Sequence, residues 1–240
     1  MLNYKKMMFG RTAASVGRID AETARMNTAE SRPALLTRKA LEQSPLYSEA
    51  LGIDLAGGGE EAWFAWFIAS QLYGGRIAEL TAARTFAVFA EEGLLSADAI
   101  VTAGRAYLIN PVMRRGGYVR YDNRKAEQIL RACGTLIERY GGRAGGLHDA
   151  ATDAADLESR LRRLYGVGPV TANIFLRELR LVWLKADPEP MPIVAQLGRV
   201  VDVDTTVYDR KTLAFVRLEA GLLRHRRQLE WRIGAQGSIR

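Results

Sequence analysis

The stretch "LYGVGPVTANIFLREL", residues 164–179, places two glycines and a proline between two helical patterns. Apolar residues recur at helical spacing through 157–164 before the glycines, and again through 174–182 after them. The pattern predicts two amphipathic helices joined by a four-residue link, which is a helix-hairpin-helix. This hairpin sets the expectation for the rest of the chain.

The link needs glycine for two physical reasons. A tight turn often requires a positive φ, and a residue without Cβ lets a ligand come close to the backbone. Pro169 suits the first turn of the second helix, where its missing N–H costs nothing. We expect the amides of Val167, Gly168 and the next residues to point outward and to bind an anion such as a phosphate. An ordinary helix–helix turn is the alternative.

The remaining chain shows helical periodicity and almost no strand signal. Gly-rich and Pro-rich breaks, such as Gly74-Gly75 and "DPEPMP" at 187–192, separate the segments. We therefore predict an all-α protein of eight or more helices. The expected helices are 61–73, 76–92, 96–103, 105–114, 123–140, 156–165, 169–183 and 210–229.

Composition excludes several classes of protein. The single cysteine, Cys133, rules out a disulfide framework, and together with only His148 and His225 it cannot form a multi-ligand zinc or iron–sulfur site. We expect no metal and no cofactor. No apolar run reaches the roughly 18 residues of a membrane span. We expect a soluble protein of the cytoplasm, associated with the nucleoid in a bacterium, or of the nucleus in a eukaryote.

Positive charge is concentrated in parts of the chain. The net charge is +7, and residues 114–131 carry 6 Lys/Arg against 2 Asp/Glu. Residues 205–240 carry 8 against 3, whereas residues 46–113 carry 3 against 8. Segregated positive charge favours a polyanionic partner, although an arginine-rich solvated surface gives the same pattern.

Three stretches in one order resemble a known family. "LRRLYGVGPVTANIFL" (161–176) is similar to the hairpin of the helix-hairpin-helix DNA glycosylase superfamily, the endonuclease III-like group. "YDNRKAEQILRACGTLIERYGG" (121–142) resembles its helix with a Lys-Ala start, and "WFIASQLYGGRIAELTAARTF" (66–86) resembles an early helix of the family. The similarity covers about residues 45–200. The iron–sulfur cluster of some relatives needs four cysteines and is not expected here.

The resemblance implies a two-lobed helical fold with a cleft between the lobes. Residues 1–40 are expected to form an N-terminal extension with mobile or partly ordered structure, and residues 41–240 the glycosylase domain. One lobe is expected from about 60–165, with the hairpin at 156–180. The second lobe is expected from the residues before 60 together with 187–240.

The family's activity implies one catalytic carboxylate. Cleavage of the bond between sugar C1′ and a base passes through an oxocarbenium-like transition state, which a nearby carboxylate stabilises. Asp187 lies 21 positions after Gly166 and precedes "PIVAQLG" (192–198), which is similar to the family's next helix. Asp187 is the expected catalytic residue. Its proline-rich surroundings leave a turn role open, and Glu189 and Asp204 remain alternatives.

Position 170 decides the expected nucleophile. Bifunctional relatives have a lysine there, whose amine attacks C1′, but this chain has Val170. The resemblance therefore implies a monofunctional DNA glycosylase that uses water. A lyase that uses Lys185 remains an alternative.

The expected partner is double-stranded DNA with a modified or mispaired base, bound by a monomeric protein. By position, Gln71 matches a glutamine that enters the duplex and Tyr121 a hydrophobic wedge, although a solvated amide and a core aromatic are the alternatives. The expected DNA-binding residues are Gly166, Val167, Gly168, Val170, Thr171, Gln71, Tyr121, Arg120, Arg124 and Lys125.

Two other functions stay open, namely a non-catalytic helix-hairpin-helix DNA-binding protein and a helical protein-interaction module. The excised base is not determined by the sequence. Deaminated pyrimidines, alkylated purines and mispaired adenine are all candidates.

Overall fold

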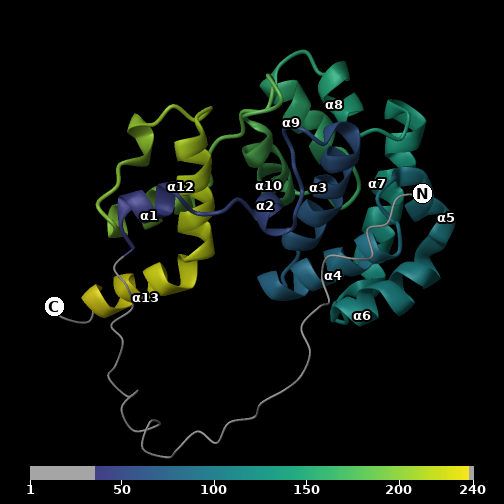
Figure 1. Cartoon of the computed structure of the whole chain (residues 1–240), viewed down its shortest axis with the longest axis horizontal. Helices are drawn as coiled ribbons and strands as arrows, with labels where there is room; N and C mark the ends of the chain where they lie inside the picture. Colours follow the sequence, from purple (N-terminus) through teal and green to yellow (C-terminus); the bar gives the residue numbers. More distant parts are fainter. Residues whose placement is uncertain (1–35, 238–240) are drawn as a thin grey trace, which may run out of the picture. The chain divides into compact units, whose positions relative to one another are not determined.

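The computed structural model describes the backbone of residues 36–237 and side chains as far as Trp231. Within these residues the fold is entirely helical, so the all-α prediction is confirmed (Figure 1). None of the described helices has the length and apolar character needed to cross a bilayer.

The larger of two buried clusters is centred on α3 (Gly59–Tyr73), the helix that is apolar nearly all round. This helix contacts α4, α7, α8 and α10 and buries Trp66 and Phe67 completely. The elements of this cluster are α2 (Tyr47–Ala50), α3, α4 (Glu79–Glu91), α5 (Ala97–Tyr107), η1 (Leu108–Met113), α6 (Arg114–Gly116), α7 (Asp122–Tyr140), α8 (Gly145–Ala150), α9 (Ala154–Arg162) and α10 (Pro169–Leu179).

A second buried cluster joins the first described helix to the last ones. Leu41 of the first of these helices is fully buried against Phe215 and Leu218. Figure 1 shows these helices, purple and yellow, side by side although they lie far apart in the sequence. The elements are α1 (Arg38–Glu42), α11 (Pro192–Val200), η2 (Thr205–Val207), α12 (Leu213–Arg224) and α13 (Arg226–Gly237).

Two expected boundaries differ from the structure. Most of the expected extension, residues 1–35, lies outside the described residues, but 38–40 belong to α1 because Leu41 anchors that helix. Residues 46–55 pack in the larger cluster, which also includes Val216 and Ala220 of α12, and Glu49 pairs with Arg217 of the same helix. The reason is Glu178, whose carboxylate accepts the N–H groups of Tyr47 and Ser48, each at 2.9 Å.

Three expected helices end or change at places that periodicity does not reveal. The segment expected at 105–114 contains a π-helical stretch around Pro111, and 210–229 is interrupted at His225. The helix expected at 169–183 ends at Leu179. Trp183 is nevertheless only 2% exposed, so the apolar pattern continues into a buried turn and hides the helix end.

One ion pair with no exposed side-chain surface links α10 to α12. Arg180 and Glu219 pair through Nη1 and Oε2, and both side chains are 0% exposed. Arg180 Nη2 also donates to the Pro188 carbonyl at 2.6 Å. Removing one partner of such a pair leaves an uncompensated buried charge, which is strongly destabilising.

We therefore expect Glu219→Ala to lower the free energy of unfolding by about 3–5 kcal/mol, measured by urea denaturation. The matched control is Glu230→Ala, which breaks an exposed i,i+4 pair with Arg226 and should cost no more than about 0.5 kcal/mol. The double variant Arg180→Met/Glu219→Leu should be more stable than Glu219→Ala, because no charge is left buried alone. Equal stability of Glu219→Ala and Glu230→Ala would contradict this role.

Candidate functional site

The hairpin turn adopts a backbone conformation that requires glycine at one position. Gly166 has φ +83°, and a Cβ there would lie 2.5 Å from Cβ of Gln128 on α7. Gly168 has an extended conformation and begins α10, with Pro169 as the first helical residue. Helices α9 and α10 are thus joined by this turn, over residues 163–168, and contact each other, and the turn lies against α7.

The amides of the turn differ from the sequence expectation at one residue. The N–H of Val167 donates to the Leu164 carbonyl at 3.1 Å, and Val167 is buried, so this amide is not free to bind an anion. Within the described residues, the N–H groups of Gly168, Val170 and Thr171 have no protein acceptor. They stand at the positive end of the α10 dipole, which suits an anion.

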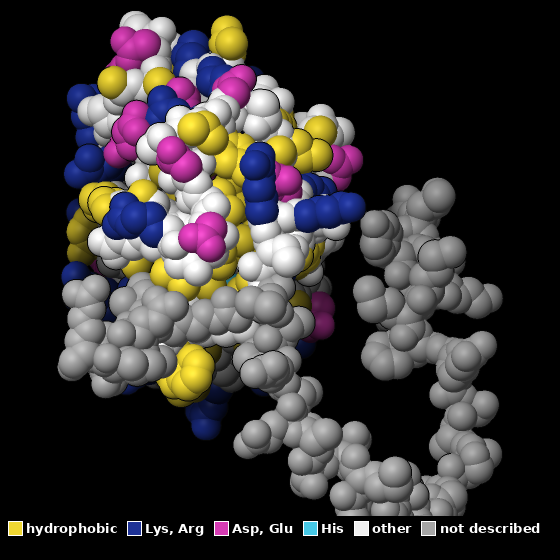
Figure 2. Space-filling view, turned by 90° about the vertical axis from the view of Figure 1, so that its left-hand side faces the viewer, with side chains coloured by type: hydrophobic (Ala, Val, Ile, Leu, Met, Phe, Trp, Pro, Cys, Tyr) yellow, Lys and Arg dark blue, Asp and Glu magenta, His cyan; other side chains and the backbone are white. Residues whose placement is uncertain are grey.

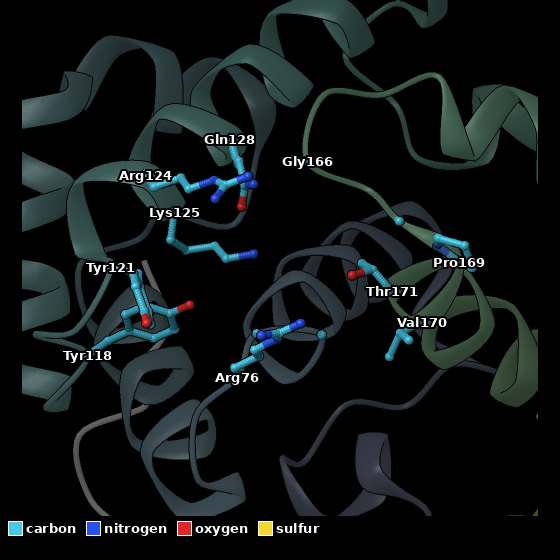
Figure 3. Close-up of a pocket in the computed structure, with 13 residues that line it drawn as sticks. Arg76, Tyr118, Tyr121, Arg124, Lys125, Gln128, Gly166, Pro169, Val170 and Thr171 are labelled. Carbon is cyan, nitrogen blue, oxygen red and sulfur yellow. The ribbon is translucent and has the colours of Figure 1, made fainter. Parts of the chain in front are cut away.

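These amides border a pocket of about 620 Å³ between the turn, α7 and the end of α3. Figure 3 shows side chains of α7 facing the first residues of α10 across it. The lining residues are Gly74, Gly75, Arg76, Tyr118, Tyr121, Arg124, Lys125, Gln128, Gly166, Gly168, Pro169, Val170 and Thr171. Seven of the ten expected DNA-binding residues meet here.

The pocket carries positive charge without an acidic counterpart. Its lining contains Arg76, Arg124 and Lys125 and no Asp or Glu. On the face shown in Figure 2, by contrast, Lys and Arg are interspersed with Asp and Glu. Three cations that share a concave surface with free amides form a favourable site for a phosphate group.

Lys125 is the most unusual cation of the three. It is only 6% exposed, and its Nζ donates to the Gln71 carbonyl at 2.8 Å. Burial, together with the nearby charge of Arg124, lowers the pKa of Lys125 to about 8. Lys125 therefore loses its charge at a pH at which an arginine remains charged.

Tyr121 is held in a strained and exposed position at the pocket. It has φ +65°, which is rare for a bulky residue, and it is 54% exposed. The Arg120 guanidinium lies 5.2 Å from its ring centroid, although Arg120 itself does not line the pocket. An exposed aromatic in a strained conformation is a hallmark of functional sites, and the core-aromatic alternative is wrong.

Gln71 is not at the protein surface, where its position in the sequence suggested that it could enter a duplex. Its side chain is 0% exposed, so in this structure it is neither free to enter a duplex nor a solvated amide. Nearby, the end of α3 approaches α10 closely, since a Cβ on Gly74 would lie 2.1 Å from Thr171 Oγ1. Gly74 thus lets the end of α3 contact α10.

Asp187 lies outside the pocket and within a group of charged side chains. Its Oδ2 is 3.0 Å from Arg210 Nη2, and its Oδ1 is 3.8 Å from Arg180 Nε. The Oδ1 atom is buried and has no hydrogen-bond partner among the described residues. The structure therefore places the expected catalytic carboxylate beside two arginines and not among the pocket residues.

The alternative residues have surroundings of their own. Glu189 is exposed and pairs with Arg210, and Asp204 caps the short η2 helix through the Thr206 amide. Lys185 Nζ donates to the carbonyls of His148 and Ala151 at 2.7 and 2.6 Å. It therefore ties the chain just before Asp187 to the end of α8.

The sequence did not indicate several residues that complete the pocket and the charged group around Asp187. Arg76 and Tyr118 join the pocket, and Arg180 and Arg210 hold Asp187. Arg76 follows the Gly74-Gly75 break, which is the only local signal for it. The two arginines are 7 residues before and 23 residues after Asp187, and no local pattern relates them to it.

Substituting each turn glycine tests the geometry. Gly166→Ala should lower the free energy of unfolding by about 2 kcal/mol or more, because alanine disfavours positive φ and Cβ contacts Gln128. Gly168→Ala should change it by less than about 0.5 kcal/mol, because its φ is negative and the space is open. Urea unfolding of both variants measures this difference, and equal losses would argue against the turn described.

Comparisons of this chain with protein-family models, with curated proteins and with solved structures give no match. The chemistry of the site is therefore inferred from its own atoms. These are free helix-terminal amides, three cations without an acidic neighbour, an exposed strained tyrosine, and a carboxylate between two arginines.

Proposed function

We propose that this chain is a DNA glycosylase that hydrolyses the bond between a base and its sugar, with water as nucleophile. The observation that carries the proposal is the pocket. Free amides of the α10 N-terminus face Arg76, Arg124 and Lys125 across a concave surface that contains no carboxylate. Such a surface is suited to one or two phosphates of a DNA strand.

Tyr121 supports the base-flipping part of the proposal. An enzyme that acts on a base must extrude it from the stack and fill the vacated space. An exposed aromatic ring at the rim of a phosphate-binding pocket is suited to this task, and the Arg120 guanidinium supports the ring from one side. The division of the buried residues into two clusters agrees with a two-lobed glycosylase fold.

Asp187 supplies the negative charge in this proposal. Its carboxylate stabilises the cationic sugar of the transition state, and water completes the hydrolysis. Arg210 pairs with Oδ2 of Asp187, and the protein buries Oδ1. Catalysis therefore requires a rearrangement that makes the Asp187 carboxylate accessible to the sugar. Arg210 is 32% exposed, so a DNA phosphate can replace Asp187 as its partner.

A non-catalytic helix-hairpin-helix DNA-binding protein is the second candidate. The observation that favours it is the ion pair of Asp187 with Arg210, because the function of a carboxylate in such a pair can be structural and not catalytic. A lyase that uses Lys185 has less support, since that amine is held by two carbonyls at the end of α8.

The deciding experiment compares the native chain with Asp187→Asn on a set of duplexes, each with one modified or mispaired base. Alkali-sensitive strand breaks measure excision, and fluorescence anisotropy measures binding. We expect the native chain to excise at least one base, and Asp187→Asn to bind DNA within about twofold while losing about 10²-fold or more in excision rate.

Asp204→Asn is the matched control, because Asp204 caps a short helix away from the pocket. It should keep native excision. Binding without excision of any base would favour the non-catalytic candidate, and full activity of Asp187→Asn would show that another residue carries the chemistry.

The titration of Lys125 gives a separate test of the phosphate-binding pocket. With a pKa of about 8, Lys125 is mostly charged at pH 7 and mostly neutral at pH 9. Affinity for undamaged duplex DNA should therefore fall as pH rises, and the slope of log K against log[salt] should decrease by about one. Lys125→Arg should remove this pH dependence. An affinity of the native chain that is the same at pH 7 and pH 9 would argue against a phosphate contact by Lys125.

A further inference from the structure

The hairpin turn carries an exposed aromatic ring beside the positively charged pocket. Tyr165, which precedes Gly166, is 43% exposed, and the Arg131 guanidinium on α7 lies 3.7 Å from the centroid of its ring. This distance is well inside the range of about 6 Å for a cation–π contact. Gly166 explains the contact, because it lies against Gln128 without a Cβ and so brings the preceding residue to Arg131, which is three positions further along α7. Arg131 and Tyr165 are called the arginine–tyrosine pair below.

The arginine–tyrosine pair and the pocket share one side of α7. Arg124, Gln128 and Arg131 are separated by four and three residues and so lie on the same face of the helix. Figure 3 shows the first two at the edge of the pocket, facing the turn. At about 1.5 Å of rise per residue, Arg131 follows Arg124 by about 10 Å along α7. Three extended residues cover at most about 11 Å, so the Tyr165 backbone is within that distance of Gly168 as well.

The positive charge around this pair is not cancelled by acidic neighbours. Arg131 and Arg163 are both exposed, and within residues 36–231 neither of them makes an ion pair. Glu127, one helical turn before Arg131, lies instead 3.9 Å from Arg105. The cationic surface of the pocket therefore continues past the turn, with guanidinium N–H groups available to a phosphate.

We propose that the arginine–tyrosine pair stacks with an unpaired base of the strand whose phosphates lie on the free amides of α10. An exposed aromatic ring offers a stacking surface to a base of any sequence, and the cations beside it hold the backbone. Inside a duplex, each base already stacks on its neighbours and has no free face. The ligand of this surface is therefore DNA in which a double strand passes into a single strand beside the hairpin. The inference rests on the DNA-binding part of the proposed function and not on excision.

The dimensions of the surface fit a short piece of one strand. A stacked strand rises about 3.4 Å per nucleotide, so the distance of about 10 Å along α7 corresponds to about three nucleotides. A phosphate held by the pocket cations and a base held by the pair therefore belong to neighbouring nucleotides of the same strand. Arg131 takes part in both contacts, since its plane stacks on Tyr165 while its N–H groups remain available to the backbone.

A purely structural role for the pair makes a different prediction. If Arg131 only fastens the turn to α7, then removing the Tyr165 ring should lower the stability of the chain. Binding should then weaken for every kind of DNA alike, because the same turn presents the amides of α10. If the pair binds a base, the loss should be confined to DNA that offers an unpaired base.

The test measures Kd by fluorescence anisotropy for an undamaged duplex extended by a short single-stranded tail at its 5′ or 3′ end. The control duplex has a tail of the same length built from base-free sugar analogues, which keeps the phosphates and removes stacking. We expect at least one tail with bases to bind about fivefold or more tighter than its base-free counterpart.

Three other outcomes are informative. Equal Kd values for the two kinds of tail would overturn the inference and leave the glycosylase proposal intact. No salt-sensitive binding to any probe would overturn both. Tighter binding of the tail with bases, without excision of any base, would support the inference and count against the glycosylase.

Variants of Tyr165 assign the effect to the pair. Tyr165→Leu should bring the ratio of the two Kd values to within about twofold of one, whereas Tyr165→Phe, which keeps the ring, should preserve the native ratio. The matched control is Tyr107→Leu, since Tyr107 is 39% exposed on α5, where its hydroxyl donates to Glu92. This control should also preserve the ratio.

Thermal unfolding verifies that each variant folds. A native ratio in folded Tyr165→Leu would overturn the inference. If that variant does not fold, Arg131→Met takes its place, because it removes the guanidinium plane and leaves the turn residues unchanged. A native ratio in Arg131→Met would overturn the inference in the same way.

Discussion

The buried guanidinium of Arg180 connects the end of α10 to α12. Arg180 directly follows the last residue of the hairpin helix α10, pairs with Glu219 on α12 and donates to the carbonyl of Pro188. Removing two charges from water is costly, and the cost is offset only when their geometry and hydrogen bonds are good. Because Arg180 makes both contacts, the position of Asp187 depends on the same pair that joins the helices.

Helix α10 therefore has a different role at each end. Its N-terminus offers unbonded amides to an anion. Its C-terminal half carries the buried Arg177 and Glu178 and is followed by the buried Arg180. Glu178 fixes α2 through two amides, while Arg180 fixes the segment that contains Asp187. A displacement of α10 would thus disturb the positively charged pocket and the carboxylate together, which would couple binding to catalysis in the proposed enzyme.

One cation of the positively charged pocket also makes a stabilising contact. Lys125 donates to the carbonyl of Gln71 in the last turn of α3, where a helix leaves carbonyls unpaired and favours a cation. The same burial that makes this bond lowers the pKa of Lys125. Arg76 and Arg124 retain their charge, so the pocket stays positive when Lys125 is neutral.

The sequence by itself determined the helical class, the hairpin and the group of residues around it, because these depend on local periodicity and on the backbone freedom of Gly166. It could not determine that the Val167 amide donates to the Leu164 carbonyl, that Gln71 is buried, or that two arginines lie beside Asp187. Those facts arise from contacts between residues distant in the sequence, such as Gly74 with Thr171 and Arg210 with Asp187. Only the tertiary structure decided them, since burial and charge pairing are properties of packed helices and not of any single segment.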